Sequence, residues 1–591
     1  MLPRIFTKRK IIILITVLFV VGFFVYFFNL NNQLFWDDDD WIINNQFVHS
    51  ISWDNIKFWL THNTLAGVGL DSNYYRPFLF LTFALNYLIS GVQPLFWHLT
   101  SNLIHIANAL LVFLLLRRYS SIWVAFITAL IFTIHPLQTE AVTYISGRGD
   151  LLVGLFILLT LFLFVKSKDG SSKSWLYKLA SLIFMALGIL SRETGIIFPF
   201  LLMIFYITFL STDKFWTSFK KSLKEAWLYF GVVIIYGILR LTVLNFQNTL
   251  NFYTSPNLYS ENIIYRILTF MHVFLDYIRL LFAPIGLHME RSMTVHTSLF
   301  QWPVWLGALI IVAIIYFIRR LYRENSKSYK IWLFGVGWFF FSLGPVSGII
   351  PINAVIYEHW LYLPMIGFWF ILAFYLVRLF KYFKSKPFVA PSLKDLFRIL
   401  LPTVLSIYFS FFVYQSIQRN ILWGKPIVFF EDILKYEPNS ARVSNNVGNL
   451  YFKQGDLVKA EEYYRRSAEA GDIFPQPHFN IGSMLQSRGD FFGAIQEYEK
   501  AIAIDPSFHY PYQNLVAIYA NQGNLVKATE YIEILKKLKP YDPRIYYNAA
   551  LIYLARNDSA SAYYNLEQGL RIAGSDKEAE QLIKDLLNKV K

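Results

Sequence analysis

Long apolar segments fill the first 425 residues, and they restrict the folds open to this chain more than any other feature. A membrane-spanning helix needs about 20 apolar residues, and eleven segments approach that length. They lie near residues 11–30, 98–116, 121–137, 151–166, 177–191, 195–211, 226–244, 302–318, 331–348, 361–380 and 396–416. Because a chain inside a bilayer must satisfy its own backbone hydrogen bonds, this pattern predicts an all-α polytopic membrane domain.

Lysine and arginine orient these predicted helices. With the N-terminus inside, the inner loops and the N-terminal tail carry 24 basic residues, whereas the outer loops carry seven. This is the distribution typical of membrane proteins. The first segment is interpreted as a retained span rather than a signal peptide, because no small-residue cleavage site follows it. Thirteen of the 18 acidic residues of this region fall on the outer side, which indicates a functional site there.

Two apolar stretches do not fit the count of eleven. Residues 77–90 and 263–283 both begin and end in outer loops, so we expect them to lie along the outer membrane surface. A span at 263–283 would reverse the orientation of everything after it.

The remaining residues, 426–591, form a second predicted domain with a 34-residue repeat. Gly455, Gly489, Gly523 and Asn557 are spaced by 34, and so are Ala460, Ala494, Ala528 and Ala562. This period, with Gly at a helix–helix turn and Ala at a helix crossing, resembles the tetratricopeptide repeat. We expect about four repeats over 441–574, followed by a capping helix, and eleven spans would put them on the outer side.

Charge and cysteine content exclude several classes of function. The formal charge is +15, yet residues 1–425 hold 35 basic and 18 acidic residues, and the repeat region is slightly acidic. The basic excess therefore follows membrane orientation, and no nucleic-acid partner is expected. The chain has no cysteine, which excludes disulfides, thiolate zinc sites and cysteine nucleophiles.

An ordered set of polar motifs occurs at the outer ends of the predicted spans. They are Trp36-Asp37-Asp38, Asn44-Asn45, Tyr75-Arg76-Pro77, Leu85-Asn86-Tyr87, His98 with Asn102 and His105, His135-Pro136, Thr139 to Val142, Ile145 to Asp150, Ser191 to Thr194, and Glu358 to Pro364. The set resembles the transmembrane and tetratricopeptide-repeat O-mannosyltransferases and their bacterial relatives, and more widely the protein O-mannosyltransferases. The chain departs from them at Gln46, where many relatives have Pro, and at Arg192, where many have Lys.

The resemblance implies a membrane bundle of the GT-C glycosyltransferase type and an inverting transfer from a polyprenyl-phosphate-linked sugar, most often mannose. An acceptor hydroxyl needs a base, and Asp37 or Asp38 matches the acidic motif of the first outer loop; the longer run of four Asp leaves the choice open. The leaving phosphate needs cations, and Arg148, Arg192 and Arg240 are the candidates. Structural alternatives are an ion pair with Asp150 or Glu140 for Arg148, an ion pair with Glu193 for Arg192, and snorkelling to the interface for Arg240.

Other polar residues on the outer side are expected to shape the sugar or acceptor pocket. These are His135, Glu140, Asp150, Glu358 and His359. No metal ligand set and no cofactor are assigned, although His with carboxylate leaves a divalent cation open as an alternative.

The expected partners are a lipid-linked sugar donor and a protein acceptor whose Ser or Thr is modified and which the repeats hold. The composition favours a bacterial inner membrane, with the site and the repeats on the periplasmic side. Two alternatives stay open: a glycan or lipid acceptor, and a non-catalytic membrane scaffold that recruits envelope proteins through its repeats.

Overall fold

The computed structural model describes residues 2–70, 72–170, 172–246, 257–324, 326, 328–352, 354–385, 391–471, 474–573 and 576–590. Within these ranges the chain contains helices and no strand, which confirms the all-α prediction. It divides into two compact units, Met1–Phe429 and Phe430–Lys591; the sequence places the boundary at 425/426. Each unit is described by itself.

The first unit is a multi-pass membrane unit. Nine helical stretches among the described residues are long and apolar enough to cross a membrane. They are formed by α1 (Leu2–Tyr26), α4 (Pro94–Leu116), α7 (Arg148–Ser167), α8 (Ser174–Ser191), α9 (Phe198–Phe205) with its flanking turns, α10 (Phe215–Leu241), α13 (Trp302–Arg323), α15 (Pro364–Ser385) and α16 (Pro391–Trp423).

Two of the eleven predicted spans are shorter helices. One is α5 (Ile122–Ile134), of 13 residues, and the other is α14 (Ser328–Leu343), of 16 residues. Each ends just before a proline, Pro136 or Pro345, because proline disfavours the helical conformation of the residue that precedes it. The stretches predicted to lie at the surface form α3 (Pro77–Ser90) and α12 (Ile263–Phe282), neither of which is among the nine.

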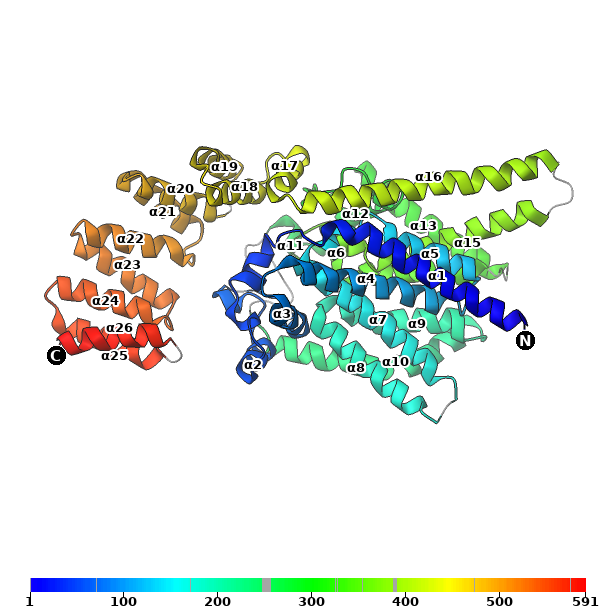
Figure 1. Cartoon of the computed structure of the whole chain (residues 1–591), viewed down its shortest axis with the longest axis horizontal. Coiled ribbons are helices and arrows are strands. Elements are labelled where there is room, and N and C mark those ends of the chain that lie inside the picture. The colour runs from blue at the N-terminus through cyan, green and yellow to red at the C-terminus, as the bar shows by residue number, and fades with distance from the viewer. Residues whose placement is uncertain are drawn as a thin grey trace. The chain divides into compact units, whose positions relative to one another are not determined.

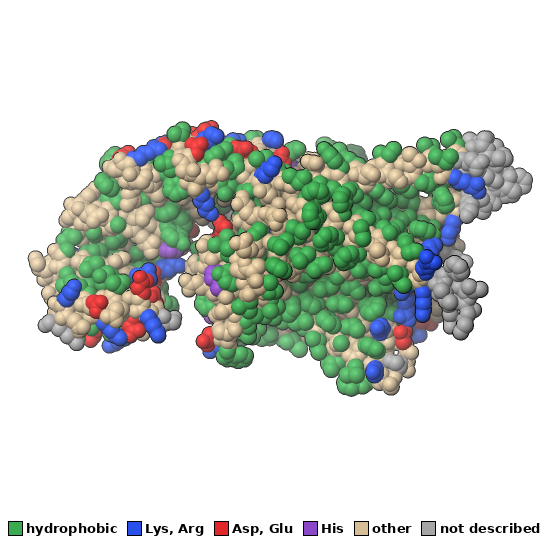
Figure 2. Space-filling model, in the orientation of Figure 1, with side chains coloured by type: hydrophobic (Ala, Val, Ile, Leu, Met, Phe, Trp, Pro, Cys, Tyr) green, Lys and Arg blue, Asp and Glu red, His purple; other side chains and the backbone are tan. Residues whose placement is uncertain are grey.

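Helix α7 lies at the centre of this unit. Of its most apolar window, 72% is buried inside the protein, against 17% for α10 and α13. It packs on α8 and α4, and Figure 1 shows these three helices running close together. Hydrophobic side chains cover the visible side of the unit, and Lys and Arg gather at the end that carries the N-terminus (Figure 2). This arrangement fits a unit surrounded by lipid.

The second unit is a helical repeat array, preceded by α17 (Pro426–Tyr436). The helices pair as α18 (Ala441–Lys453) with α19 (Leu457–Glu469), α20 (Gln476–Ser487) with α21 (Phe491–Ile504), α22 (His509–Asn521) with α23 (Leu525–Leu538), and α24 (Pro543–Ala555) with α25 (Ser559–Ile572), before α26 (Lys577–Val590). The predicted capping helix is therefore α26; residues 574, 575 and 591 lie outside the described residues.

The repeat phase read from the sequence is confirmed by the backbone. Gly455, Gly489 and Gly523 connect the helices of the first three pairs with φ of 82°, 82° and 73°, and Asn557 does so in the fourth with φ of 58°. Glycine, and less often asparagine, tolerates this left-handed conformation at a helix end. The alanines of the second column are fully buried where the helices cross.

Candidate functional site

The first outer loop places Asp38 inside the protein. Only 3% of Asp38 is exposed, and its Oδ1 accepts hydrogen bonds from the backbone N–H (2.9 Å) and the hydroxyl (2.6 Å) of Ser146. Burial raises the pKa of Asp38 to about 7, although the bonds from Ser146 oppose this shift. Trp36, two residues earlier, has φ of +66°, a conformation that costs free energy in a bulky residue. Asp37, between them, is only half-buried.

Buried hydrogen bonds between asparagine and threonine side chains hold the segment that leads from α1 into this loop. Asn29 donates to Asn102 on α4 (3.1 Å) and to Thr143 (3.0 Å). Thr143 in turn donates to the side chain of Asn420 on α16 (2.5 Å), and Asn32 donates to the carbonyl of Asn420 (2.8 Å). Because buried polar groups are costly to leave unpaired, this network holds the end of α1 against α4 and α16.

A second polar chain runs from Asp150 through Arg192 and His359 to Glu140. Arg192 Nη1 donates to Asp150 Oδ2 (2.7 Å), and Arg192 Nη2 faces His359 Nε2 (3.1 Å). His359 Nδ1 and Glu140 Oε1 are 2.6 Å apart, and the backbone N–H of His359 donates to Glu140 Oε2 (3.1 Å). All four side chains are largely buried, so these contacts are shielded from water.

This chain fixes the tautomer of His359. A guanidinium can only donate, so Nε2 must accept from Arg192 and Nδ1 must carry the proton that it donates to Glu140. His359 is therefore neutral, which agrees with burial lowering its pKa to about 3. Burial raises the pKa of Glu140 to about 7, while Arg419, Arg291 and Arg192 act in the opposite direction.

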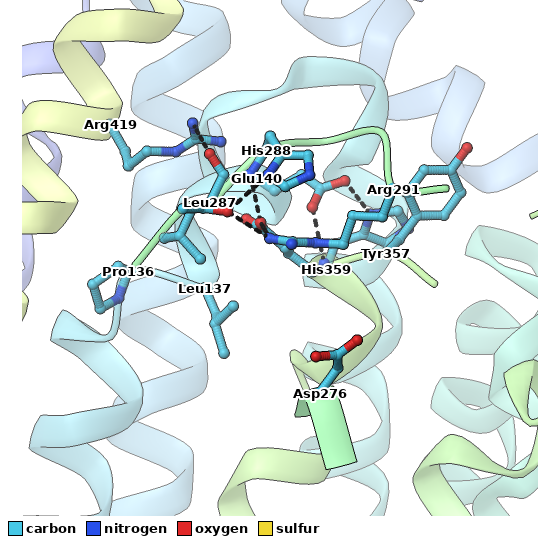
Figure 3. A network of polar contacts seen from close by, with 12 residues as sticks. Pro136, Leu137, Glu140, Asp276, Leu287, His288, Arg291, Tyr357, His359 and Arg419 are labelled. Atoms are coloured by element: carbon cyan, nitrogen blue, oxygen red, sulfur yellow. Dashed lines mark hydrogen bonds and ion pairs between the residues drawn. The ribbon is translucent and has the colours of Figure 1, made fainter. Parts of the chain in front are cut away.

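A third group of contacts lies beside Glu140, where the segment between α12 and α13 folds over it (Figure 3). Glu358 Oε1 accepts from Arg291 Nη2 (2.5 Å) and from the backbone N–H of His288 (2.7 Å). Arg419, on α16, donates to the carbonyl of Leu287 (2.6 Å). The two arginines also act on the charge of Glu358, whose pKa burial raises. The site thus combines carboxylates and guanidinium groups from distant parts of the chain.

An ion pair from the first outer loop lies close to Arg192. Arg76 Nε donates to Glu193 Oε2 (3.0 Å), and the backbone N–H of Tyr75 donates to the other oxygen of Glu193 (2.8 Å). The charges of Arg76 and Glu193 both act on Arg192. The alternative pairing of Arg192 with Glu193 is therefore not formed; Glu193 pairs with Arg76, and Arg192 with Asp150.

Arg148 lies on the same segment as Ser146 and Asp150, between the two, and the charge of Asp38 acts on it, but its hydrogen bonds are made to α3 and α4. It is fully buried and donates to Ser101 (3.2 Å), to Asn86 (2.6 Å) and to the carbonyl of Trp97 (2.9 Å). It forms no ion pair with either of the carboxylates considered as its partners. With every guanidinium nitrogen engaged by α3 or α4, Arg148 fits a structural role, and the geometry gives no support to the phosphate role predicted for it.

Arg240 and His135 also bond to the backbone rather than into the network. Arg240 is 3% exposed and donates to the carbonyls of Leu244 (2.6 Å) and Asn73 (2.5 Å). His135 is fully buried, with Nε2 3.0 Å from the carbonyl of Leu281 and Nδ1 accepting from the backbone N–H of Leu137. The structure therefore brings together Glu140, Asp150, Arg192, Glu358 and His359, and leaves these two residues outside.

Sequence reasoning did not single out Arg291 or Arg419 as site residues. Arg419 lies three residues beyond the last predicted apolar segment, 396–416, so it read as a boundary residue, whereas in the structure it is 6% exposed and within α16. Arg291 had no local signal, since it lies in a loop without a distinctive motif. Within the described residues no three His, Asp or Glu side chains are grouped to hold a metal ion.

The space beside the network is small in this conformation. Asp150, Thr194, Ser342 and His359 contribute to the lining of a cavity of about 20 Å³, which has room for roughly one water molecule.

Comparison with known proteins gives matches in both units. A sequence profile described as dolichyl-phosphate-mannose-protein mannosyltransferase matches residues 77–240, and two tetratricopeptide-repeat profiles match residues 430–476 and 475–508. The chain is similar to a protein O-mannosyl-transferase of Caenorhabditis elegans, with 23% identity over 79% of this chain and 64% of that protein. It is also similar to protein O-mannosyl-transferase TMTC4 of Mus musculus, with 26% identity over 73% of this chain and 62% of that protein.

The chain thus spans somewhat under two thirds of the length of these relatives. Among solved structures it is similar to the oligosaccharyltransferase of Archaeoglobus fulgidus tethered with an acceptor peptide, with 12% identity and a TM-score of 0.42 over 73% of this chain and 57% of that one. A score of this size supports no argument about the site.

Proposed function

Since the chain resembles the transmembrane and tetratricopeptide-repeat O-mannosyltransferases in both of its units, we propose that it is an inverting membrane glycosyltransferase. It moves a sugar, which the resemblance indicates is mannose, from a polyprenyl-phosphate-linked donor to a Ser or Thr hydroxyl of a protein. The reaction takes place on the outer side of the membrane, which in a bacterium is the periplasmic side of the inner membrane.

One observation carries this proposal: residues 138–150 join the acidic loop to the arginine network. Within this segment Ser146 binds Asp38, Glu140 binds His359, and Asp150 binds Arg192. A glycosyl transfer to a hydroxyl needs a carboxylate for the acceptor and cations for the leaving phosphate. Both kinds of group are anchored here by the same short segment of chain.

Asp37 is the better candidate for the base. Asp38 is buried and has both oxygens engaged, Oδ1 by Ser146 and Oδ2 by the backbone N–H of Phe35 (3.4 Å). Asp37 is only half-buried, so an acceptor hydroxyl can approach its exposed part, and the hydroxyl of Tyr144 interacts with the same carboxylate. In this mechanism Asp37 takes the hydroxyl proton, the oxygen attacks C1 of the sugar, and the bond from C1 to the phosphate oxygen breaks.

Arg192 is the candidate that stabilises the leaving phosphate. Asp150 and His359 each occupy one N–H of its guanidinium, which leaves further N–H groups for phosphate oxygens. The two contacts fix the plane of the guanidinium. A preoriented cation costs less reorganisation when negative charge develops on the leaving group.

The repeat unit is proposed to hold the protein acceptor. On the first helix of the second pair, Asn480 donates to Asn445 (2.9 Å) and Asn449 (3.1 Å) of the first pair. Asn514, on the first helix of the third pair, donates to the hydroxyl of Tyr498 (2.8 Å). Asparagine amides on the inner helices of such arrays are suited to bind a peptide backbone.

The test is transfer by the purified chain, reconstituted with polyprenyl-phosphate mannose that carries a radiolabel and with envelope extract. We expect label in protein, and we expect Asp37→Asn to reduce it by about 100-fold or more, the contribution typical of a general base. Asp54→Asn, an exposed carboxylate on α2 (Trp53–Thr61), is the matched control and should transfer normally. Label in glycan alone would show that the acceptor is a glycan and not a protein. No transfer from any lipid-linked sugar would favour the non-catalytic scaffold.

A further inference from the structure

The pair formed by Arg291 and Glu358 is incomplete. Arginine and a carboxylate can share two parallel hydrogen bonds, yet these residues share one, from Nη2 to Oε1. Arg291 Nε and Glu358 Oε2 are both buried and have no hydrogen-bond partner among the described residues. The side chain of Arg291 is about nine-tenths buried, at 10% exposed, and that of Glu358 is fully buried.

This leaves one buried cationic donor and one buried anionic acceptor unpaired, on two residues that share a single hydrogen bond. Unpaired buried charged groups are costly, and their own mutual bond would remove both costs. The contacts around them explain why it does not form: Glu358 Oε1 is held by the N–H of His288, and Arg291 Nη2 also donates to the carbonyl of Gly286 (3.0 Å). Arg419 holds the same turn through the carbonyl of Leu287. The turn thus keeps the two atoms apart.

We propose that Arg291 and Glu358 form the subsite for the sugar-phosphate head group of the donor, which rests on the function proposed above. A phosphate oxygen accepts from Arg291 Nε, and a sugar hydroxyl donates to Glu358 Oε2. A glycosyl phosphate is a ligand class that offers an anionic acceptor and a neutral donor a few ångströms apart. A bare phosphate satisfies only the arginine, so Glu358 makes the subsite selective for the glycosylated lipid.

The subsite adds a second cation beside Arg192. It does not include Arg148 or Arg240, the other two arginines that the sequence suggested for the donor phosphate. Arg291 and Arg192 both act on the charge of Glu140, so they lie around one carboxylate. Arg148, by contrast, is saturated by protein acceptors.

The experiment measures equilibrium binding of two lipids, polyprenyl phosphate and polyprenyl-phosphate mannose, to the full chain in lipid nanodiscs. For the unmodified chain we expect tighter binding of the mannosylated lipid. Arg291→Gln should weaken binding of both lipids about tenfold or more, the loss expected for one charged hydrogen bond. Glu358→Gln should leave the affinity for polyprenyl phosphate unchanged or higher and should abolish the preference for the mannosylated lipid.

Arg279→Gln is the matched control, because Arg279 is a half-exposed arginine on α12 that pairs with Asp276 (3.4 Å); this variant should bind both lipids normally. Arg291→Lys keeps the charge and removes the Nε donor, so it should fold and still bind more weakly, even if Arg291→Gln does not fold. Normal binding by both Arg291 variants would overturn the subsite while leaving the proposed function intact. Failure of the unmodified chain to bind either lipid would overturn both.

Discussion

Asp37 and Asp38 are neighbours in sequence, but their surroundings give them different properties. Asp38 is buried against Ser146, and its pKa of about 7 lies well above the ordinary value of 3.8. A group whose pKa is raised by folding stabilises the folded state below its ordinary pKa, and this contribution is lost as the pH rises through the folded value. Asp38 therefore favours the folded state at low pH.

We expect the unmodified chain to lose stability relative to Asp38→Asn between about pH 4 and pH 7. The difference between their free energies of unfolding should change by up to about 1.4 kcal/mol per pH unit. The comparison between the two proteins isolates Asp38, because Glu140, whose pKa burial raises to about 7, and His359, whose pKa burial lowers to about 3, act in opposite directions in both. Thermal unfolding in detergent across this range measures the difference. An identical pH profile for the variant would contradict the assigned burial of Asp38.

Glu140 fixes the proton of His359, and this gives a second prediction. In Glu140→Gln an amide N–H₂ can face His359 Nδ1, which would force the proton onto Nε2, opposite the N–H groups of Arg192. We expect a loss of roughly 1–3 kcal/mol in the free energy of unfolding, the cost of leaving a buried hydrogen-bonding group unpaired. Glu261→Gln, an exposed residue of α11 (Leu258–Glu261), should melt like the unmodified chain. Equal melting of the two variants would refute the fixed tautomer.

Motifs in the sequence were sufficient to choose most residues of the network. They could not distinguish an arginine that is bound by other parts of the protein from one that can still bind a ligand. Glu140, Asp150 and His359 follow motifs at the ends of spans, and the structure does bring them together. Whether an arginine is free to meet a ligand depends on acceptors supplied by other helices. Arg148 meets Asn86 and Trp97, which lie more than 50 residues away in sequence, so no local pattern could reveal its saturation.

At the scale of elements, helix α16 matters beyond its apolar surface. Its Asn420 accepts from Thr143 and donates to the carbonyl of Val25 (2.8 Å). The helix therefore ties the end of α1 to the segment that contains Glu140. Hydropathy predicts such a helix as a span but says nothing of the side chain that anchors it.

Asn420→Ala should destabilise the membrane unit by about 1–3 kcal/mol, because it leaves a buried hydroxyl and a buried carbonyl unpaired. Since the acidic loop begins at the end of α1, transfer should also decrease. Thr403→Ala on the same helix is the control, because Thr403 is exposed and bonds only to the carbonyl of Ile399 within its own helix. Thermal unfolding of Asn420→Ala and Thr403→Ala measures the difference. Equal unfolding midpoint temperatures for the two variants would contradict a stabilising role for the Asn420 hydrogen bonds.

At the scale of the whole molecule, sequence pattern predicts two units well. Apolar length gives the membrane unit, and the 34-residue period gives the repeats, since both depend on local periodicity. Hydropathy alone predicts helices that are too long for α5 and α14. The prolines that follow these helices end them earlier than the apolar segments end.

The sidedness of the chain is open to a direct test, because it has no cysteine of its own. Single Cys substitutions at Asp54, Lys220 and Lys577, all exposed, give unique labelling sites. In intact spheroplasts we expect a membrane-impermeant maleimide to label positions 54 and 577, and to label position 220 only after permeabilisation. Positions 54 and 577 on opposite faces would refute a shared compartment for the acidic loop and the repeats.

The contacts around Glu140 also bear on how the enzyme would finish a turnover. Arg192, Arg291 and Arg419 supply as many positive charges as Glu140, Asp150 and Glu358 supply negative ones when all are ionised. Transfer turns a singly charged phosphodiester into a phosphomonoester that bears more charge, and an electropositive pocket would retain that spent carrier lipid. Since burial raises the pKa of Glu140 to about 7, the pocket approaches electroneutrality only as the pH rises above that value. We therefore expect product inhibition by the carrier lipid to weaken with rising pH.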